Sequence, residues 1–250
     1  MFTIDERDGV RERLLRLAET DPCVIAAAIT GSYAADDSDE WSDIDLAFSI
    51  LGELAPALEQ WAELLHGDFG ALHHWDLQSG SSVYRVFLLP RCLEVDISFT
   101  PSGDFGPRGP SWRSVFGKAA EPIASEPTPF DSLAGMAWHH VLHARACIER
   151  GKPWQAEYLI GGIRHQVLAL ACSRLGHTTA YAKGADLLPP DLTAPLEGTL
   201  VRSLDEGELW RALAVAADAL AAELERAAPT LAARLRPTLT ELTGPSGNGS

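Results

Sequence analysis

The spacing of apolar residues changes once along this chain, and that change limits the folds it can adopt. Up to about residue 129, short alternating or apolar runs bounded by Gly, Pro and polar residues predict strands, mixed with two helical segments. Beyond Asp131 the strand patterns end and helical periodicity takes over. We therefore predict an α/β (α+β) protein with a small mixed-sheet domain over residues 1–125 and a helical bundle over residues 126–250.

Helices and strands are interleaved in the first half of the sequence. Thr3 precedes an acidic first turn and a helical run of apolar residues, which predicts a capped helix that ends near Thr20. Between Ile44 and Ile50, apolar residues alternate with polar or small ones, which predicts a strand. In full, the predicted helices are 3–20 and 54–65, and the predicted strands are 23–29, 44–50, 82–89 and 93–99.

The second half of the sequence is predicted to be helical. Gly and Pro are frequent between Pro101 and Pro129, and we predict the interdomain linker there. The Gly/Pro/Ser-rich tail after Thr243 is predicted to be frayed. The predicted helices are 133–150, 154–175 and 206–228, with a weaker one over 192–204.

Charge and hydropathy argue against two functional classes. The 250 residues include 20 Lys and Arg against 35 Asp and Glu, and the net charge of −15 has the wrong sign for sustained nucleic-acid binding. A cationic small molecule would be attracted by this field, although a solvated acidic surface gives the same charge. No run reaches the ~18 apolar residues of a membrane span and no basic leader opens the sequence, so we predict a cytoplasmic protein.

The four cysteines are far apart, and their spacing predicts neither a zinc site nor a disulfide framework. Each lies in an apolar stretch, so we predict small buried apolar side chains rather than a catalytic thiol. They are Cys23, Cys92, Cys147 and Cys172.

The most informative segment joins a Gly-Ser turn to a pair of aspartates. Gly31-Ser32 follows a predicted strand, and a glycine there lets backbone N–H groups approach a phosphate, with the Ser32 hydroxyl as a further donor. Asp43 and Asp45 lie at i and i+2 of a strand, so their carboxylates share one face and repel each other unless a cation lies between them. Mg²⁺ bound to the phosphates of a nucleotide would remove that repulsion.

A third carboxylate is predicted on a neighbouring strand. Glu94, Asp96 and Ser98 share one face of the strand predicted over 93–99. Asp96 could complete a three-carboxylate cluster for two-metal phosphoryl or nucleotidyl transfer. Glu94 competes for that role, and we favour Asp96 because β-branched residues flank it on both sides.

This arrangement resembles the nucleotidyltransferase superfamily, which includes DNA polymerase beta and the antibiotic nucleotidyltransferases. The match runs over about residues 23–99 and is carried by Gly31, Ser32, Asp43, Asp45 and Asp96 in the order of the family motif. The resemblance implies a small mixed sheet flanked by helices, two Mg²⁺ ions, and transfer of AMP from ATP with release of pyrophosphate. It further implies that Asp43 and Asp45 bind both metals, that Asp96 binds one, and that Gly31 and Ser32 bind the triphosphate.

The second half resembles, more loosely, the helical domains of small-molecule adenylyltransferases such as those that act on aminoglycosides. Residues 150–157 and Arg164 carry the likeness. Glu157, Gly161 and Arg164 lie on one helix stripe, and the small residue leaves room for a ligand. We predict Arg164 as a nucleotide contact and Glu157 as an acceptor contact or base, although a solvated charged face gives the same pattern.

We therefore predict a Mg²⁺-dependent adenylyltransferase that acts on the hydroxyl of a small molecule, an aminoglycoside-like cation being one such acceptor, as in antibiotic resistance. The acceptor is expected in a cleft between the two halves or, if Glu157 plays no part, in the Gly/Pro-rich segment 101–117. The alternatives are an antitoxin-like protein that modifies or covers a partner protein, and a nucleotide-binding protein without transferase activity. His139 and His143 lie at i and i+4, but with no Glu placed as in a His-Glu-x-x-His motif we predict packing or surface roles.

Overall fold

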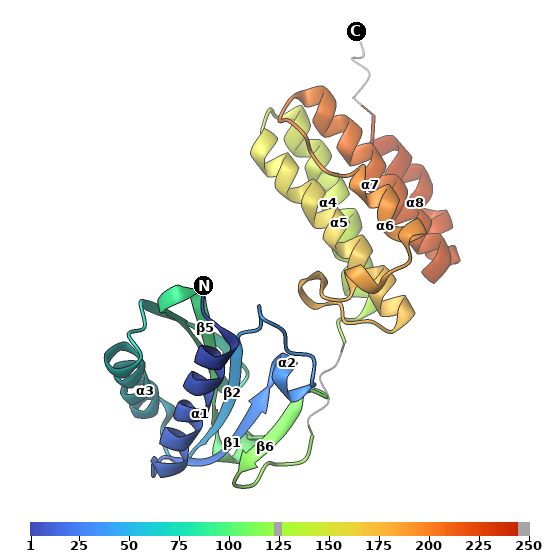
Figure 1. The fold of residues 1–250 in the computed structure, drawn as a ribbon. Helices are drawn as coiled ribbons and strands as arrows, with labels where there is room; N and C mark the ends of the chain where they lie inside the picture. The colour runs from blue at the N-terminus through green and yellow to red at the C-terminus, as the bar shows by residue number, and fades with distance from the viewer. Residues whose placement is uncertain (123–126, 245–250) are drawn as a thin grey trace. The chain divides into compact units, whose positions relative to one another are not determined.

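The computed structural model of the chain describes residues 1–122 and 127–244. The chain divides into two compact units, Met1–Ser125 and Glu126–Ser250. The first contains a six-stranded mixed sheet with flanking helices, and the second is helical (Figure 1). The predicted fold class is thereby confirmed. The expected frayed tail falls mainly on residues 245–250, which lie outside the described residues.

The sheet of the first unit has the strand order β3-β4-β5-β2-β1-β6. Strands β2 and β5 pair in parallel, and the other neighbouring pairs are antiparallel. This parallel pair lies at the centre of the sheet. Because β2 and β5 run in the same direction, their amino-terminal ends meet at the same edge of the sheet. The strands are β1 (Val24–Thr30), β2 (Ile44–Ile50), β3 (His73–Ser79), β4 (Ser82–Leu89), β5 (Leu93–Pro101) and β6 (Trp112–Phe116).

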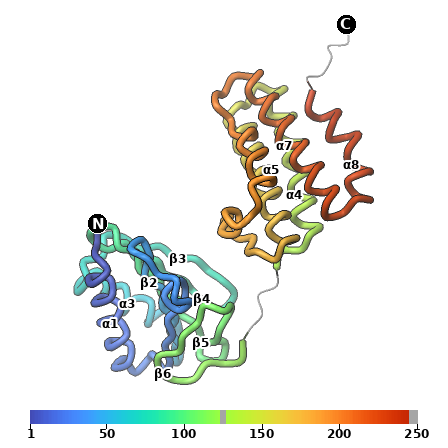
Figure 2. The backbone as a smooth tube through the Cα atoms, turned by 45° about the vertical axis from the view of Figure 1, so that its right-hand side comes forward, coloured from blue at the N-terminus to red at the C-terminus, as the bar shows by residue number. Residues whose placement is uncertain are grey.

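One face of this sheet is covered by α1 (Ile4–Thr20) and α3 (Leu54–Asp68), which lie on the same side of it in Figure 2. Thr3 caps α1 and forms a reciprocal capping box with Glu6, as the sequence predicts. Every second residue of the central strands is apolar and packs under these helices. One of them is Phe48, whose ring centroid lies 4.8 Å from that of Trp61. Because strand side chains alternate, Asp45 and Asp96 project from the opposite face.

Two strands were not predicted from the sequence. Strand β3 is exposed along almost its whole length, and its apolar alternation is limited to Trp75 and Leu77. Strand β6 lies between Gly/Pro-rich segments and pairs with β1 at the edge of the sheet (Figure 1). The linker predicted to begin at Pro101 is therefore wrong for residues 101–116, which belong to the sheet unit.

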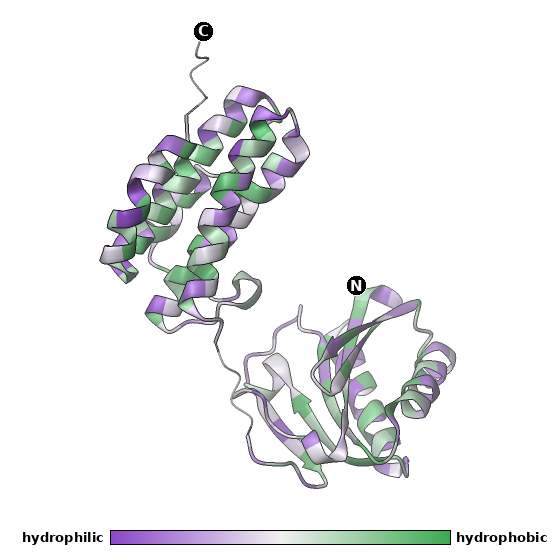
Figure 3. Cartoon of the chain, turned by 180° about the vertical axis from the view of Figure 1, so that it is seen from behind, coloured by the Kyte–Doolittle hydropathy of each residue, from purple (hydrophilic) through white to green (hydrophobic). Residues whose placement is uncertain are grey.

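The second unit is a bundle whose helices turn apolar residues toward one another and polar residues outward (Figure 3). Its core consists mainly of Ala, Leu, Ile and Val, and the frequent alanines allow the helices to pack closely. Its helices are α4 (Phe130–Glu149), α5 (Pro153–Leu175), α6 (Pro190–Glu197), α7 (Glu206–Ala227) and α8 (Pro229–Leu242).

Three details of the sequence prediction are corrected. The weak helix expected over 192–204 is α6, which ends at Glu197, and α8 was not predicted. Cys92 is exposed and Cys23 half-buried, because both lie at element ends; Cys147 and Cys172 are buried as expected.

Within the described residues, no helix is both long and apolar enough to cross a membrane.

Candidate active site

Asp45 and Asp96 lie side by side on the two parallel strands at the centre of the sheet. They are register partners of β2 and β5, one step after the pair Ile44 and Val95. The apolar pair packs under the helices, whereas both aspartates are half-buried on the opposite face. The parallel pairing therefore brings together two carboxylates that are 51 positions apart in the sequence.

The backbone of Gly31 lies directly against the carboxylate of Asp45. Gly31 has φ +64°, and a Cβ built on it would lie 1.8 Å from Asp45 Oδ2. A side chain at residue 31 is thus excluded both by backbone strain and by steric overlap. The Gly-Ser turn and the carboxylate pair, which are separate motifs in the sequence, form one continuous site.

Ser32 lies in the short helix α2 (Gly31–Ala34), which cation–aromatic contacts hold in place. The Arg11 guanidinium lies 3.5 Å from the centroid of the Tyr33 ring, and Arg113 donates a hydrogen bond to the Tyr33 carbonyl at 3.2 Å. The Ser32 hydroxyl oxygen is buried and has no hydrogen-bond partner within the described part of the chain. A buried hydroxyl without a partner is able to donate to a bound anion.

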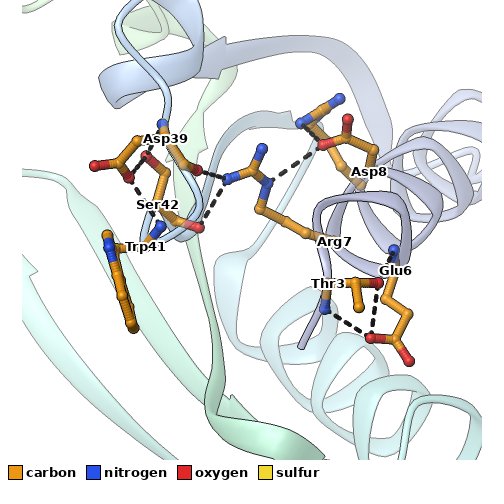
Figure 4. Close-up of polar contacts among 8 residues, drawn as sticks. Thr3, Glu6, Arg7, Asp8, Asp39, Trp41 and Ser42 are labelled. Carbon is orange, nitrogen blue, oxygen red and sulfur yellow. Dashed lines mark hydrogen bonds and ion pairs between the residues drawn. The ribbon is translucent and has the colours of Figure 1, made fainter. Parts of the chain in front are cut away.

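Arg7 holds the loop that leads into Asp43 through hydrogen bonds to Asp39 and Ser42 (Figure 4). The Arg7 side chain is buried and donates from Nη1 to the carbonyls of Asp39, at 2.5 Å, and Ser42, at 3.2 Å. Asp39 and Ser42 are also joined through the Ser42 hydroxyl, at 3.0 Å. These bonds fix the backbone immediately before Asp43. No sequence signal distinguishes Arg7 from the other arginines of its helix.

The carboxylates of this face repel one another electrostatically. Burial, followed by the charges of Asp43 and Glu94, raises the pKa of Asp96 to about 6. Burial and then the charge of Asp43 raise the pKa of Glu94 above its usual value. Glu94 is exposed and lies two residues nearer the amino-terminal end of β5 than Asp96. The competitor considered from the sequence therefore belongs to the same electrostatic cluster, in a more solvated position.

The donor set of this face suits a hard divalent cation. Asp96 Oδ1 is buried without a hydrogen-bond partner among the described residues, and the neighbouring donors are carboxylate oxygens, which Mg²⁺ prefers. Over residues 1–122 and 127–244, no three His, Cys, Asp or Glu side chains are grouped as a preformed metal centre. The fit to Mg²⁺ thus depends on the chemistry and register of the carboxylates.

The two predicted residues of the helical half lie in the second unit, on α5. Arg164 donates from Nη1 to the Thr199 carbonyl at 3.3 Å and to the Thr199 hydroxyl at 3.2 Å, and Thr199 is fully buried. Its guanidinium also lies over Gly161, where a Cβ would be 3.5 Å from Nη2. Arg164 therefore fastens the loop after α6, while Glu157 is half-buried on the same helix. The histidines of α4 pack together, with His139 and His143 ring centroids 4.2 Å apart.

No protein-family model matches the chain, and no curated protein matches its sequence. Among solved structures it is similar to an aminoglycoside 6-adenyltransferase from Bacillus subtilis, at 11% identity over 97% of this chain and 99% of the other, with a TM-score of 0.41. It is also similar to the polymerase core of TRAMP, an RNA surveillance complex, at 13% identity over 98% and 85% of the two chains, with a TM-score of 0.30.

Proposed function

We propose that this chain is a nucleotidyltransferase that transfers AMP from ATP to a hydroxyl group of a small molecule and releases pyrophosphate. The observation that carries the proposal is the register pair Asp45 and Asp96 with the Gly31 backbone against Asp45. A glycine turn in contact with paired carboxylates is an arrangement that suits the phosphates and the metal ions of a nucleotide. The sequence resemblance to nucleotidyltransferases points to the same residues.

The roles of the site residues follow from their chemistry. Asp43, Asp45 and Asp96 would hold Mg²⁺, as two ions, and the bound metal would neutralise the charge that develops on the phosphates. The Gly31 backbone and the Ser32 hydroxyl would contact the triphosphate. Asp96 is also a candidate to accept the hydroxyl proton, because its carboxylate lies beside Asp45 on the neighbouring strand.

The acceptor of the transferred AMP is proposed as a class of compound with a location. The sequence offers two candidates: a cationic acceptor such as an aminoglycoside, attracted by the net charge of −15 and in contact with Glu157, or an acceptor bound along the Gly/Pro-rich segment 101–117. The Glu157→Gln variant tests that role: a raised acceptor KM with little change in kcat supports it. Unchanged acceptor kinetics would move the acceptor to the segment 101–117.

A pyrophosphate-release screen tests the proposed reaction. The wild-type chain is incubated with ATP, Mg²⁺ and a panel of aminoglycosides, lincosamides and hydroxylated metabolites, with Asp45→Asn as the negative control. Acceptor-dependent release that requires Asp45 supports the proposal. If ATP binds but no acceptor stimulates release above the Asp45→Asn background, the chain is a nucleotide-binding protein without this activity.

A further inference from the structure

The face of the sheet that carries the carboxylates also contains a cavity of about 140 Å³ inside the first unit. It is lined by strand residues, including Ala47 of β2 with Ser98 and Thr100 of β5, which we call the floor. Phe105 and Arg108, between β5 and β6, and Trp112, at the start of β6, complete the lining and are called the roof. A cavity of similar volume, about 150 Å³, can hold one benzene ring. The space therefore suits a single-ring compound.

The roof of this cavity is fixed at several points. The Phe105 carbonyl accepts a hydrogen bond from the Ala120 backbone at 2.7 Å, and the Phe105 and Trp112 rings pack with centroids 5.1 Å apart. Gly106 lies so close to Ala120 that a Cβ would be 3.0 Å from its carbonyl oxygen. Space remains under Phe105 because the neighbouring residues of β1 and β2 are alanines, Ala47 among them. The cavity is thus produced by the packing of small residues under a fixed segment.

The cavity adjoins the proposed reaction site. Ala47 and Ser98 are register partners, two positions beyond the partners Asp45 and Asp96 and on the same face. Two strand residues span about 6.6 Å, so a ring in the cavity can place a substituent at the carboxylates. Thr30, which also lines the cavity, immediately precedes Gly31.

The lining selects by charge. Among the residues described, Arg108 is the one charged side chain that lines the cavity, and the polar remainder consists mainly of hydroxyl groups. Arg108 Nη2 donates to the Ser82 hydroxyl at 3.1 Å, and Ser82 is hydrogen-bonded to Thr100, four residues beyond Asp96 on β5. The cation therefore lies toward the end of the cavity that is farther from the carboxylates. A polycation would be repelled by Arg108, whereas an anionic substituent would be attracted.

We propose that this cavity binds the acceptor of the transfer reaction, and that the acceptor is a single-ring compound with a hydroxyl group at one end and an anionic group at the other. The identification as an acceptor rests on the proposed function. In the reaction, the acceptor oxygen bonds to the α-phosphorus, the bond from that phosphorus to the bridging oxygen breaks, pyrophosphate leaves with the electron pair, and the hydroxyl proton passes to a carboxylate of the site. A nucleobase fits the cavity less well, because it offers Arg108 no anionic group.

Binding of three ring compounds of matched size tests the charge preference without nucleotide or metal. The probes are 4-hydroxybenzoate, neutral 4-hydroxybenzamide and cationic 4-hydroxybenzylamine, measured on the full chain by calorimetry or ligand-observed NMR. We expect 4-hydroxybenzoate to bind about tenfold more tightly than the amine, in line with one charge-assisted hydrogen bond. Equal affinities, or no binding of the benzoate, would overturn the proposal.

Variants at two lining residues, Arg108 and Ala47, locate the probe. Arg108→Gln should remove the preference for the anion and Arg108→Lys should restore part of it, while Arg16→Gln, at an exposed site of α1, should change nothing. Ala47→Leu fills the floor of the cavity and should lower the affinity of every probe that binds by at least about tenfold. Ala55→Leu, on the exposed side of α3, should leave these affinities unchanged. Circular dichroism and Tm confirm that each variant is folded. Unchanged affinities in Ala47→Leu would show that the probes bind elsewhere.

Addition of ATP separates the remaining possibilities. Competition between ATP and 4-hydroxybenzoate for the same site would assign the cavity to the nucleotide and overturn the proposal. Binding of both, with acceptor-dependent pyrophosphate release when Mg²⁺ is added, supports both proposals. Binding of the benzoate at the cavity with no release would leave the site standing and contradict the proposed function.

Discussion

Gly31 and Asp45 are in such close contact that a methyl group on residue 31 would overlap the Asp45 carboxylate, at 1.8 Å from Oδ2. The contact connects the residue after β1 to strand β2, which carries Asp45. It explains why a residue with no side chain stands between a buried strand and the Ser32 hydroxyl. The same contact gives the most direct test of the site.

Gly31→Ala should destabilise the fold by about 1–3 kcal/mol because of its positive φ, and it should also displace Asp45 and abolish turnover. Gly52→Ala is the matched control, since Gly52 has φ +95° but nothing within 4 Å of a built Cβ. Urea denaturation and pyrophosphate release measure the two effects. If Gly52→Ala lost as much activity as Gly31→Ala, backbone strain alone would account for the loss.

Asp43→Ala and Asp45→Ala should each lower turnover at least about 100-fold without loss of stability, because neighbouring carboxylates repel each other when no cation is bound. Glu59→Ala, on the exposed surface of α3, controls for the removal of a negative charge. Pyrophosphate release and Tm are measured for each. Near-normal turnover with Mg²⁺ in either aspartate variant would refute the metal-binding role.

Asp96→Asn should change the dependence of stability on pH. The Asp96 pKa is about 6 in the folded chain and near 3.9 in an unfolded one, so the folded state binds the proton more tightly. The stabilising contribution of Asp96 is therefore fully present below about pH 4, and it is lost as the pH rises through 6. Asp96→Asn should be more stable than wild type at pH 8, by roughly 1–3 kcal/mol, and similar to it at pH 4.

The free energy of unfolding in urea, measured with EDTA between pH 4 and pH 8, checks the Asp96 prediction. Asp37→Asn, in the exposed loop before β2, is the control for charge removal. The same pH profile for Asp96→Asn and wild type would show that Asp96 has an ordinary pKa in the folded chain.

Ser32→Ala should weaken nucleotide binding about three- to tenfold and leave the acceptor KM nearly unchanged, because the hydroxyl is one phosphate donor among several. The hydroxyl oxygen has no hydrogen-bond partner within the described residues, so its removal should not lower Tm. Calorimetric titration with ATP and Mg²⁺ measures the change, with Ser102→Ala as the exposed control. Equal nucleotide affinity in Ser32→Ala and wild type would remove Ser32 from the site.

Arg164→Gln should destabilise the helical unit by about 1–3 kcal/mol, because the Arg164 guanidinium donates to both the carbonyl and the hydroxyl of buried Thr199. Glu157→Gln, on the same helix, should leave stability within about 0.5 kcal/mol. Urea denaturation compares the two variants. A fully stable Arg164→Gln variant with weakened ATP binding would favour the nucleotide contact predicted from the sequence over the structural role.

Local patterns determined much of this protein. The alternation around Asp45 predicted β2 with its boundaries and faces, and the cap at Thr3 predicted the start of α1, because both depend on neighbours in the sequence. Strand β6 was missed because its partner is β1, about 80 residues away, and its own residues lie among Gly and Pro. A short edge strand is stabilised by pairing rather than by its own periodicity.

The site shows the same division. The sequence by itself determined which residue types are available: a Gly-Ser turn, an i, i+2 pair of aspartates and a later aspartate on a strand. Only the tertiary structure decided that Asp45 and Asp96 are register partners, that Arg7 fixes the loop before Asp43, and that Arg108 covers a cavity beside them. These relationships depend on strand order and on contacts between residues far apart in the chain, which no local spacing encodes.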